Sequence, residues 1–267
     1  MTDTGRALRA LYQPQGGVGA IFDDKVRDYM AARPDYPRAL IDALADGIAR
    51  PAAEATVADL GAGSGLLTRA LLARFGTVWA VEPGAPMRAA CDAMLGGSPG
   101  YRSAAGAAEA IPLPAGSVDL ITAAQAFHWF DVPRARAEAR RVLAPGGQVA
   151  LVWNDRVGGD PLHQALDALF AEFGGAKRSA LVAHEERRGV DDFFGAAGFE
   201  TRQWPHAHAL DRDGLLALAF SRSYMPARDT PAGRAATARL DEVFARHAEG
   251  GQLQVRYTTV LMRGAPG

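Results

Sequence analysis

The chain has 267 residues, of which 48% are hydrophobic and 22% are charged, and its formal net charge is −1. That length suits one large α/β domain or two small ones, and the apolar fraction is enough for a sizeable core. A net charge so close to zero excludes the basic footprint that is typical of proteins that bind nucleic acids or anionic membrane surfaces. We therefore expect neither a nucleic acid nor a membrane among its partners.

The single cysteine, Cys91, excludes an intramolecular disulfide and favours a reducing compartment. The first residues contain no continuous apolar run of the kind that a secretory signal needs. The longest apolar runs are too short to cross a bilayer. We expect a cytoplasmic protein that is a monomer or a homodimer.

The first fifty residues predict a small helical cap. Residues 21–30 and 38–48 have helical spacing of apolar residues, and a proline-containing break at residues 33–37 separates them. We assign residues 1–50 to this cap and residues 51–267 to the main domain.

A regular alternation of strands and helices begins near residue 56. The expected strands are 57–60, 77–81, 101–103, 118–123 and 148–153, and the expected helices are 66–75, 86–95 and 133–143. Residues 144–147, Ala-Pro-Gly-Gly, predict a turn after the last of these helices. This alternation predicts a doubly wound, mostly parallel sheet with helices on both faces, which binds ligands beyond the carboxyl ends of its strands.

The last third of the chain is less regular. We expect helices at 161–173, 190–197, 211–221 and 231–248, and strands at 199–204 and 253–261, which bring the sheet to seven strands. Helices between the last two strands would cover the strand ends. Residues 205–250 are therefore predicted to form a helical lid over a substrate site.

The segment Asp59-Leu60-Gly61-Ala62-Gly63-Ser64-Gly65 joins the first strand to its helix. Glycines remove Cβ atoms where a ligand must approach the backbone, and a helix start offers unpaired N–H groups. A dinucleotide fingerprint needs its third glycine where this chain has Leu66, and the Gly-Lys-Ser/Thr of a phosphate-binding P-loop is absent. The spacing instead resembles the first motif of the class I S-adenosylmethionine (SAM) methyltransferases, although an ordinary glycine-rich turn is an alternative.

Glu82 follows the second predicted strand, 21 residues after Gly61. A carboxylate at that place can accept both hydrogen bonds of a ribose diol, as it also does in NAD-binding folds, so Glu82 does not distinguish the two cofactors. Pro83 shapes the following turn. Met87 lies where it would pack on an adenine ring or fill the core.

Two later blocks, Gly106–Leu120 and Gln125-Ala126-Phe127-His128-Trp129-Phe130-Asp131, extend the resemblance. They are similar to the type 11 small-molecule group of class I SAM-dependent methyltransferases, which includes relatives of the ubiquinone/menaquinone and trans-aconitate methyltransferases. Further similarity at residues 33–37, 221–224 and 256–258 carries the resemblance over residues 21–261. It implies a Rossmann-like seven-stranded fold, SAM as methyl donor, S-adenosylhomocysteine (SAH) as product and a small molecule as acceptor.

The resemblance also implies where SAM binds. The implied cofactor residues are Arg33, Asp59, Gly61, Ala62, Gly63, Glu82, Pro83, Met87, Ala107, Ala108, Gln125 and Ala126. Arg33 is expected to pair with the SAM carboxylate. Many of the resembled enzymes have an acid at the place of Ala107. Backbone groups of Ala107 and Ala108, or the side chain of Glu109, must therefore receive the adenine amino group.

Methyl transfer from a sulfonium is an in-line displacement, which needs the nucleophile and the methyl group held close and aligned. A histidine has an unperturbed pKa of about 6.5, which suits His128 to act as the base; the alternative is a histidine that only positions its loop. The candidate acceptor contacts are Trp129, which would stack on a planar acceptor or pack beneath the lid, and Arg222, Tyr224 and Tyr257, which would bind a carboxylate or a polar ring. The expected acceptor atom is nitrogen or oxygen, with carbon as an alternative.

No metal site is predicted. The segment at residues 184–188 lacks the second histidine of a zincin, and His206 and His208 share a strand face without an evident third ligand. Two other functions stay open. One is an NAD(P)-dependent oxidoreductase, against which the early Gly65 and the absence of a Tyr-x-x-x-Lys pair argue; the other is a SAM-binding regulatory or interaction protein without catalysis, which Ala107 keeps in consideration.

Overall fold

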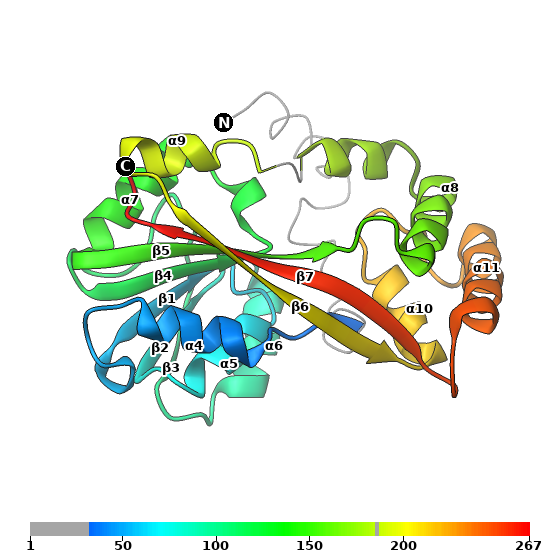
Figure 1. Cartoon of the computed structure of the whole chain (residues 1–267), viewed down its shortest axis with the longest axis horizontal. Coiled ribbons are helices and arrows are strands. Elements are labelled where there is room, and N and C mark those ends of the chain that lie inside the picture. The colour runs from blue at the N-terminus through cyan, green and yellow to red at the C-terminus, as the bar shows by residue number, and fades with distance from the viewer. Residues whose placement is uncertain (1–31, 185–186) are drawn as a thin grey trace.

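The computed structural model describes residues 32–184 and 187–267, and its centre is a seven-stranded sheet (Figure 1). The strand order is β3-β2-β1-β4-β5-β7-β6. The strands are β1 (Thr56–Leu60), β2 (Thr77–Val81), β3 (Tyr101–Ala104), β4 (Val118–Ala124), β5 (Leu143–Arg156), β6 (Glu200–Leu210) and β7 (Leu253–Gly264). The first five are parallel, and β7 runs antiparallel to both β5 and β6. The predicted doubly wound, mostly parallel seven-stranded α/β fold is confirmed.

Helices cover both faces of this sheet. The α-helices are α4 (Arg38–Asp46), α5 (Leu66–Leu72), α6 (Ala85–Leu95), α7 (Val132–Val142), α8 (Pro161–His184), α9 (Val190–Phe194), α10 (Arg212–Phe220) and α11 (Pro231–His247). α4 and α5 pack their leucines on one face of the sheet, and α7 and α9 pack on the other. Central strands β1 and β4 are therefore buried almost throughout, whereas the edge strand β6 is exposed over its first four residues and then alternates between half-buried and exposed residues up to the buried Leu210.

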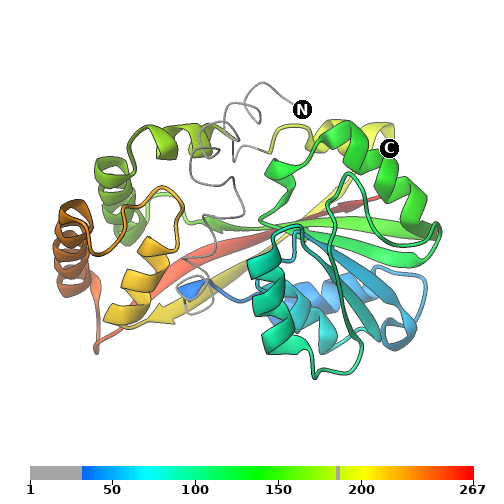
Figure 2. The same cartoon turned by 180° about the vertical axis from the view of Figure 1, so that it is seen from behind.

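A second core lies beyond the sheet, where α8, α10 and α11 pack against the beginning of β7. The two views agree that these three helices gather at one end of β6 and β7, away from α4–α7 (Figures 1 and 2). Helix α8 follows β5, and α10 and α11 follow β6. The helical cover is thus built from two separate insertions, of which only the second lies in the range 205–250.

Several predicted boundaries differ from the observed ones. β6 continues to Leu210, past the predicted end at residue 204, because it is an edge strand and an edge strand tolerates Pro205. Helix α8 continues to His184 through a non-helical Gly175, whereas a helix ending at residue 173 was expected. The predicted turn at residues 144–147 lies inside β5, where the pairing with β4 shifts register between Val118 and Leu120.

The helix predicted at residues 21–30 and most of the predicted cap at residues 1–50 lie outside the described residues. Of that cap, the structure describes Ala32 onward, with α4 as its helix. Within the described part of the chain, no helix combines the length and the apolar character that a membrane span requires.

Candidate functional site

The glycine loop between β1 and α5 uses left-handed backbone at three positions. Gly61, Gly63 and Gly65 have φ values of +66°, +57° and +89°. A Cβ at Gly61 would lie 2.8 Å from the Cβ of Ala126, and one at Gly65 would lie 2.6 Å from Sγ of Cys91. A Cβ at Gly63 would meet nothing within 4 Å. Gly61 and Gly65 are therefore required by packing, whereas Gly63 borders open space into which a ligand can fit.

Asp59, at the end of β1, is turned into the core. Its carboxylate accepts hydrogen bonds from Oγ1 of Thr68 at 2.7 Å and from Oγ1 of Thr122 at 2.8 Å. Burial and, to a smaller extent, nearby Glu82 raise the pKa of Asp59 to about 6, against the lowering effect of the two threonine hydroxyls. Because both oxygens are bonded inside the protein, Asp59 ties β1 to α5 and β4 and supports the loop from behind.

Glu82, at the end of β2, lies against the glycine loop. Its Oε2 accepts from the backbone N–H of Gly63 at 2.9 Å, and its Oε1 accepts from that of Gly84 at 2.8 Å. Burial raises the pKa of Glu82, although both backbone bonds favour the charged form. Each carboxylate oxygen has a second lone pair, so the fixed carboxylate can still accept hydrogen bonds from a diol. Beside it, Pro83 is exposed and Met87 is buried.

The segment after β3 forms a tight turn. Ala110 donates its N–H to the carbonyl of Ala107 at 3.0 Å, and Ala108 is buried. Oε1 of Glu109 accepts from the backbone N–H of Asp131 at 2.6 Å. That bond links the loop after β3 to the loop after β4, a contact that the sequence did not suggest.

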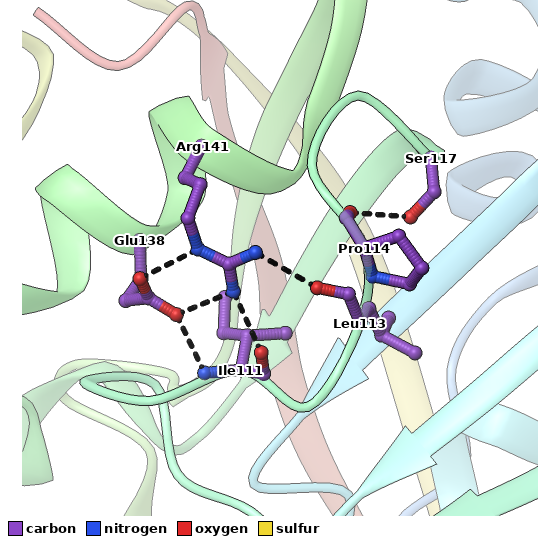
Figure 3. A network of polar contacts seen from close by, with 6 residues as sticks. All are labelled: Ile111, Leu113, Pro114, Ser117, Glu138 and Arg141. Atoms are coloured by element: carbon purple, nitrogen blue, oxygen red, sulfur yellow. Dashed lines mark hydrogen bonds and ion pairs between the residues drawn. The ribbon is translucent and has the colours of Figure 1, made fainter.

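A charged pair on α7 fastens the chain that follows this turn (Figure 3). The Arg141 guanidinium donates to the carbonyls of Ile111 and Leu113 and to both oxygens of Glu138, at 2.7–2.9 Å. Glu138 in turn accepts from the N–H of Ile111 at 2.8 Å. Arg141 and this N–H hold the pKa of Glu138 below its usual range. The pair could have been predicted from the sequence, because Glu138 and Arg141 have i and i+3 spacing on a predicted helix.

The loop after β4 contains a backbone outlier. Gln125 has φ of +54°, and within the described residues it is the one non-glycine residue with positive φ. Its N–H donates to the carbonyl of Val152 at 2.9 Å. Such conformations occur mainly where the surrounding structure enforces them, often at functional sites. Next to it, Ala126 is buried against Gly61, and Phe127 is buried edge-on to Trp153 and Phe193.

A cavity of about 540 Å³ lies between this loop and the helical insertions. Seven of the predicted site residues line it: Arg33, Gln125, His128, Trp129, Arg222, Tyr224 and Tyr257. Of the other predicted residues, Asp59, Gly61, Ala62, Gly63, Glu82 and Ala126 lie in or against the glycine loop, and Ala107 and Ala108 lie in the turn after β3. Leu66, the first residue of α5 after the glycine loop, also lines the cavity, so the cavity adjoins that loop.

Sequence reasoning missed much of the cavity wall. The missed residues include Tyr36, the end of β5 from Trp153 to Arg156, the loop to Asp160, and His163 and Asp167 on α8. Their position beyond the carboxyl end of β5 follows the general rule for such sheets, which would have pointed to them.

The acidic residues of the wall are paired. Asp155 binds Arg187, and Asp167 binds Arg156 and Arg178. Burial raises the pKa of Tyr257, and the positive charges of Arg222, Arg33 and Arg156 act against that rise because they favour the ionised phenolate. The wall around Tyr257 is therefore rich in guanidinium groups.

In the described ranges 32–184 and 187–267, no group of three or more His, Cys, Asp or Glu side chains has the arrangement of a metal site. Burial lowers the pKa of both His206 and His208 on β6, although nearby Asp35 favours their charged forms. The segment 184–188 lies partly outside the described residues.

Comparison with known proteins gives consistent matches. A family profile described as a methyltransferase domain matches residues 58–151. An uncharacterised methyltransferase of Mycobacterium bovis is 34% identical over 245 residues, which cover 91% of this chain and 94% of that protein. An uncharacterised methyltransferase of Schizosaccharomyces pombe is 39% identical over 140 residues, which cover 52% and 54% of the two chains.

Among solved structures, one named "a Putative Type II Methyltransferase from Anaeromyxobacter dehalogenans" is similar with a TM-score of 0.65. It is 27% identical, and the match covers 87% of this chain and 97% of that one. The near-complete match to the Mycobacterium bovis relative, the matched domain and the shared fold agree with the strand order and the glycine loop. The chain belongs to the class I SAM-dependent methyltransferases.

Proposed function

We propose that this protein transfers the methyl group of SAM to a nitrogen or oxygen atom of a small-molecule acceptor, with carbon as the alternative, by in-line displacement and with SAH as the second product. Family membership excludes the NAD(P)-dependent oxidoreductase. The observation that carries the proposal is the cavity of about 540 Å³ that adjoins the glycine loop at Leu66. Its volume falls in the range of about 300–1,000 Å³ that small-molecule sites occupy.

The residues at the ends of β1 and β2 fit SAM. Gly63 leaves open space beside the loop, and the carboxylate of Glu82 is held where it can accept the two hydrogen bonds of a ribose diol. Gly61 and Ala62 carry the backbone past this space. When bound, SAM supplies an electrophilic methyl group on a positively charged sulfur.

The two ends of SAM have separate binding residues in this proposal. Pro83, Met87, Ala107 and Ala108 enclose the adenine ring. At the other end, Arg33 pairs with the methionine carboxylate. Gln125 and Ala126 shape the backbone between the cofactor and the cavity.

His128 is the proposed catalytic base. It lines the cavity three residues after Gln125, which has positive φ, and its ring centroid lies 5.0 Å from that of Trp129. An imidazole nitrogen of His128 takes the proton that the acceptor loses as its nucleophilic atom is methylated. Trp129, Arg222, Tyr224 and Tyr257 hold the acceptor in line.

The helices outside the sheet form the proposed lid. We assign to it residues 211–247, the helical part of the predicted range 205–250, and add α8, which packs into the same core. This lid excludes water from the cavity during transfer.

Calorimetry and a turnover assay test the proposal. SAH is expected to bind and NADH to give no heat, and SAH release is expected with at least one acceptor from a panel of small acids, phenols and amines. A protein that binds no SAH contradicts the proposal. Binding of SAH without turnover on any member of the panel favours the non-catalytic SAM-binding protein instead.

A further inference from the structure

Glu109 is a half-buried carboxylate beside the site, and the proposed mechanism gives it no role. It lies in the tight turn at residues 107–110, and its Oε1 accepts a hydrogen bond from the backbone N–H of Asp131 at 2.6 Å, across 22 residues of chain. In the proposed function, the turn on one side of this bond encloses the adenine, and the loop on the other side carries His128. The bond therefore joins the cofactor side of the site to the proposed base.

This bond replaces a contact that helices usually make within their own first turn. Asp131 is the N-cap of α7, and the backbone N–H at an N-cap has no partner inside the helix. In a capping box, a Glu or Gln three residues later accepts from that N–H. Here that place holds Arg134, whose own N–H donates to Oδ1 of Asp131 at 3.4 Å. The carboxylate comes instead from Glu109, so the start of α7 depends on the turn after β3.

The loop that carries His128 is held at both ends. At its beginning, the N–H of Gln125 donates to the carbonyl of Val152 at 2.9 Å, and the ring of Phe127 is buried in the core. At its end, the N–H of Asp131 donates to Glu109. Because His128 lies between Phe127 and Asp131, the second of these anchors fixes the part of the loop from which the imidazole projects.

The backbone that carries Glu109 is itself fixed. Ala110 donates its N–H to the carbonyl of Ala107 at 3.0 Å and closes the turn. The chain that follows is fastened to α7 by Glu138 and Arg141 (Figure 3). These contacts do not involve the Glu109 side chain. Altering that side chain should therefore release the His128 loop and leave the turn in place.

We propose that Glu109 is a positioning residue for His128, and that its carboxylate fixes the loop of His128 to the turn that encloses the adenine. This inference rests on the proposed function for the roles of His128 and of the turn. Bound SAM and the imidazole are then held against the same piece of backbone, which is the alignment that in-line transfer needs. The adenine amino group is left to the backbone groups of Ala107 and Ala108.

The test compares Glu109→Ala, which removes the acceptor, with Glu109→Gln, whose amide oxygen can still accept from the N–H of Asp131. The full chain is labelled with 15N at histidine, and the ring signals of His128 are recorded without any ligand. Glu109→Ala is expected to broaden or split these signals, and Glu109→Gln is expected to keep the single set of the unaltered protein. Glu54→Ala, which alters an exposed carboxylate before β1, is the matched control and is expected to change nothing.

A second measurement separates positioning from direct binding of the adenine. In Glu109→Ala, the dissociation constant of SAH should change by less than about threefold, whereas kcat should fall about tenfold at unchanged KM for SAM, as expected for the loss of one hydrogen bond to a charged acceptor. Glu109→Gln should restore most of kcat. Undisturbed His128 signals in Glu109→Ala, or signals that are equally disturbed in Glu109→Gln, would overturn the proposal.

The ligand-free spectra also keep this inference distinct from the proposed function. They need neither SAH nor turnover, so disturbed signals in Glu109→Ala support the anchor even if His128→Ala leaves kcat unchanged, a result that would count against the base. If Glu109→Ala does not fold, amide hydrogen exchange of the unaltered protein decides the matter. The N–H of Asp131 should then exchange about tenfold or more slowly than in an unstructured peptide, and unprotected exchange contradicts the anchor.

Discussion

The two halves of the site are built in different ways. At the ends of β1 and β2, the glycine loop presents backbone, and one fixed carboxylate, Glu82, projects beside it. On the other side of Leu66, aromatic and charged side chains line the cavity. They come from β5, α8 and β7, from the loops after β4 and α10, and from the segment before α4. The first half therefore depends on conformation, and the second depends on side-chain identity. Substitutions in each half test whether the two halves differ in this way.

The largest effect is expected on the free energy of unfolding, in a comparison of Gly61→Ala with Gly63→Ala. Both place a Cβ on left-handed backbone, which costs about 1–2 kcal/mol. Only the first adds a contact of 2.8 Å to Ala126, for about 1–3 kcal/mol more. Urea unfolding should show this difference, and calorimetry should show that Gly63→Ala weakens SAH binding although it loses only the backbone contribution of about 1–2 kcal/mol in stability. Equal losses of stability in the two variants would contradict the distinction between packing and ligand glycines.

On the cavity side, His128→Ala is expected to lower kcat about a hundredfold or more if the imidazole removes a proton, equivalent to about 2.7 kcal/mol or more. SAH binding should not change, since His128 is assigned to the acceptor side. His208→Ala is the matched control. A change confined to KM would show that His128 positions the acceptor and does not act as a base.

Beneath the glycine loop, Asp59 makes stability depend on pH. Its folded-state pKa of about 6 lies above its unfolded value, so the native state binds more protons between about pH 4 and 6. The stabilisation is complete below the unfolded pKa and is lost as pH rises through about 6, a change of about 2–3 kcal/mol. Asp59→Asn should remove this slope. Urea unfolding of both proteins at pH 4 to 7 measures it, and parallel pH profiles would refute the assignment.

The smallest change is expected in the SAH affinity when Glu82 is altered, the one carboxylate beside the glycine loop. Glu82→Ala should weaken SAH binding by about 1.5–3 kcal/mol, the range for hydrogen bonds to a charged group. Calorimetric dissociation constants measure this change. Glu242→Ala, which alters an exposed carboxylate on α11 away from the loop, serves as control. An unchanged dissociation constant in Glu82→Ala argues against ribose binding.

The same contrast explains how much could be predicted from the sequence. The glycine loop and Glu82 lie within 22 residues, from 61 to 82, and their spacing reflects local backbone geometry. The strands at 57–60 and 77–81 were predicted within one residue because apolar runs and turn residues mark their ends.

The cavity wall was harder to predict because it joins residues as distant as Arg33 and Tyr257. The sequence pattern pointed to His128 and Trp129 through a continuous block. It did not point to His163, whose place depends on how α8 packs against β7. The left-handed conformation of Gln125 was also hidden, since no local signal distinguishes a glutamine that the fold forces into that region.

The pairing of the last two strands limits how the lid can move. β6 and β7 pair along Glu200–Leu210, but β7 pairs with β5 only from Tyr257 onward. The remaining part is a two-stranded ribbon that leaves the sheet and carries α10 and α11 at its far end (Figure 1). In our proposal, opening of the lid therefore bends this ribbon or slides α8 past α11. Leu253 and Val255 touch no ligand in our proposal. Substitutions at such positions would then slow or accelerate the exchange of acceptor and product.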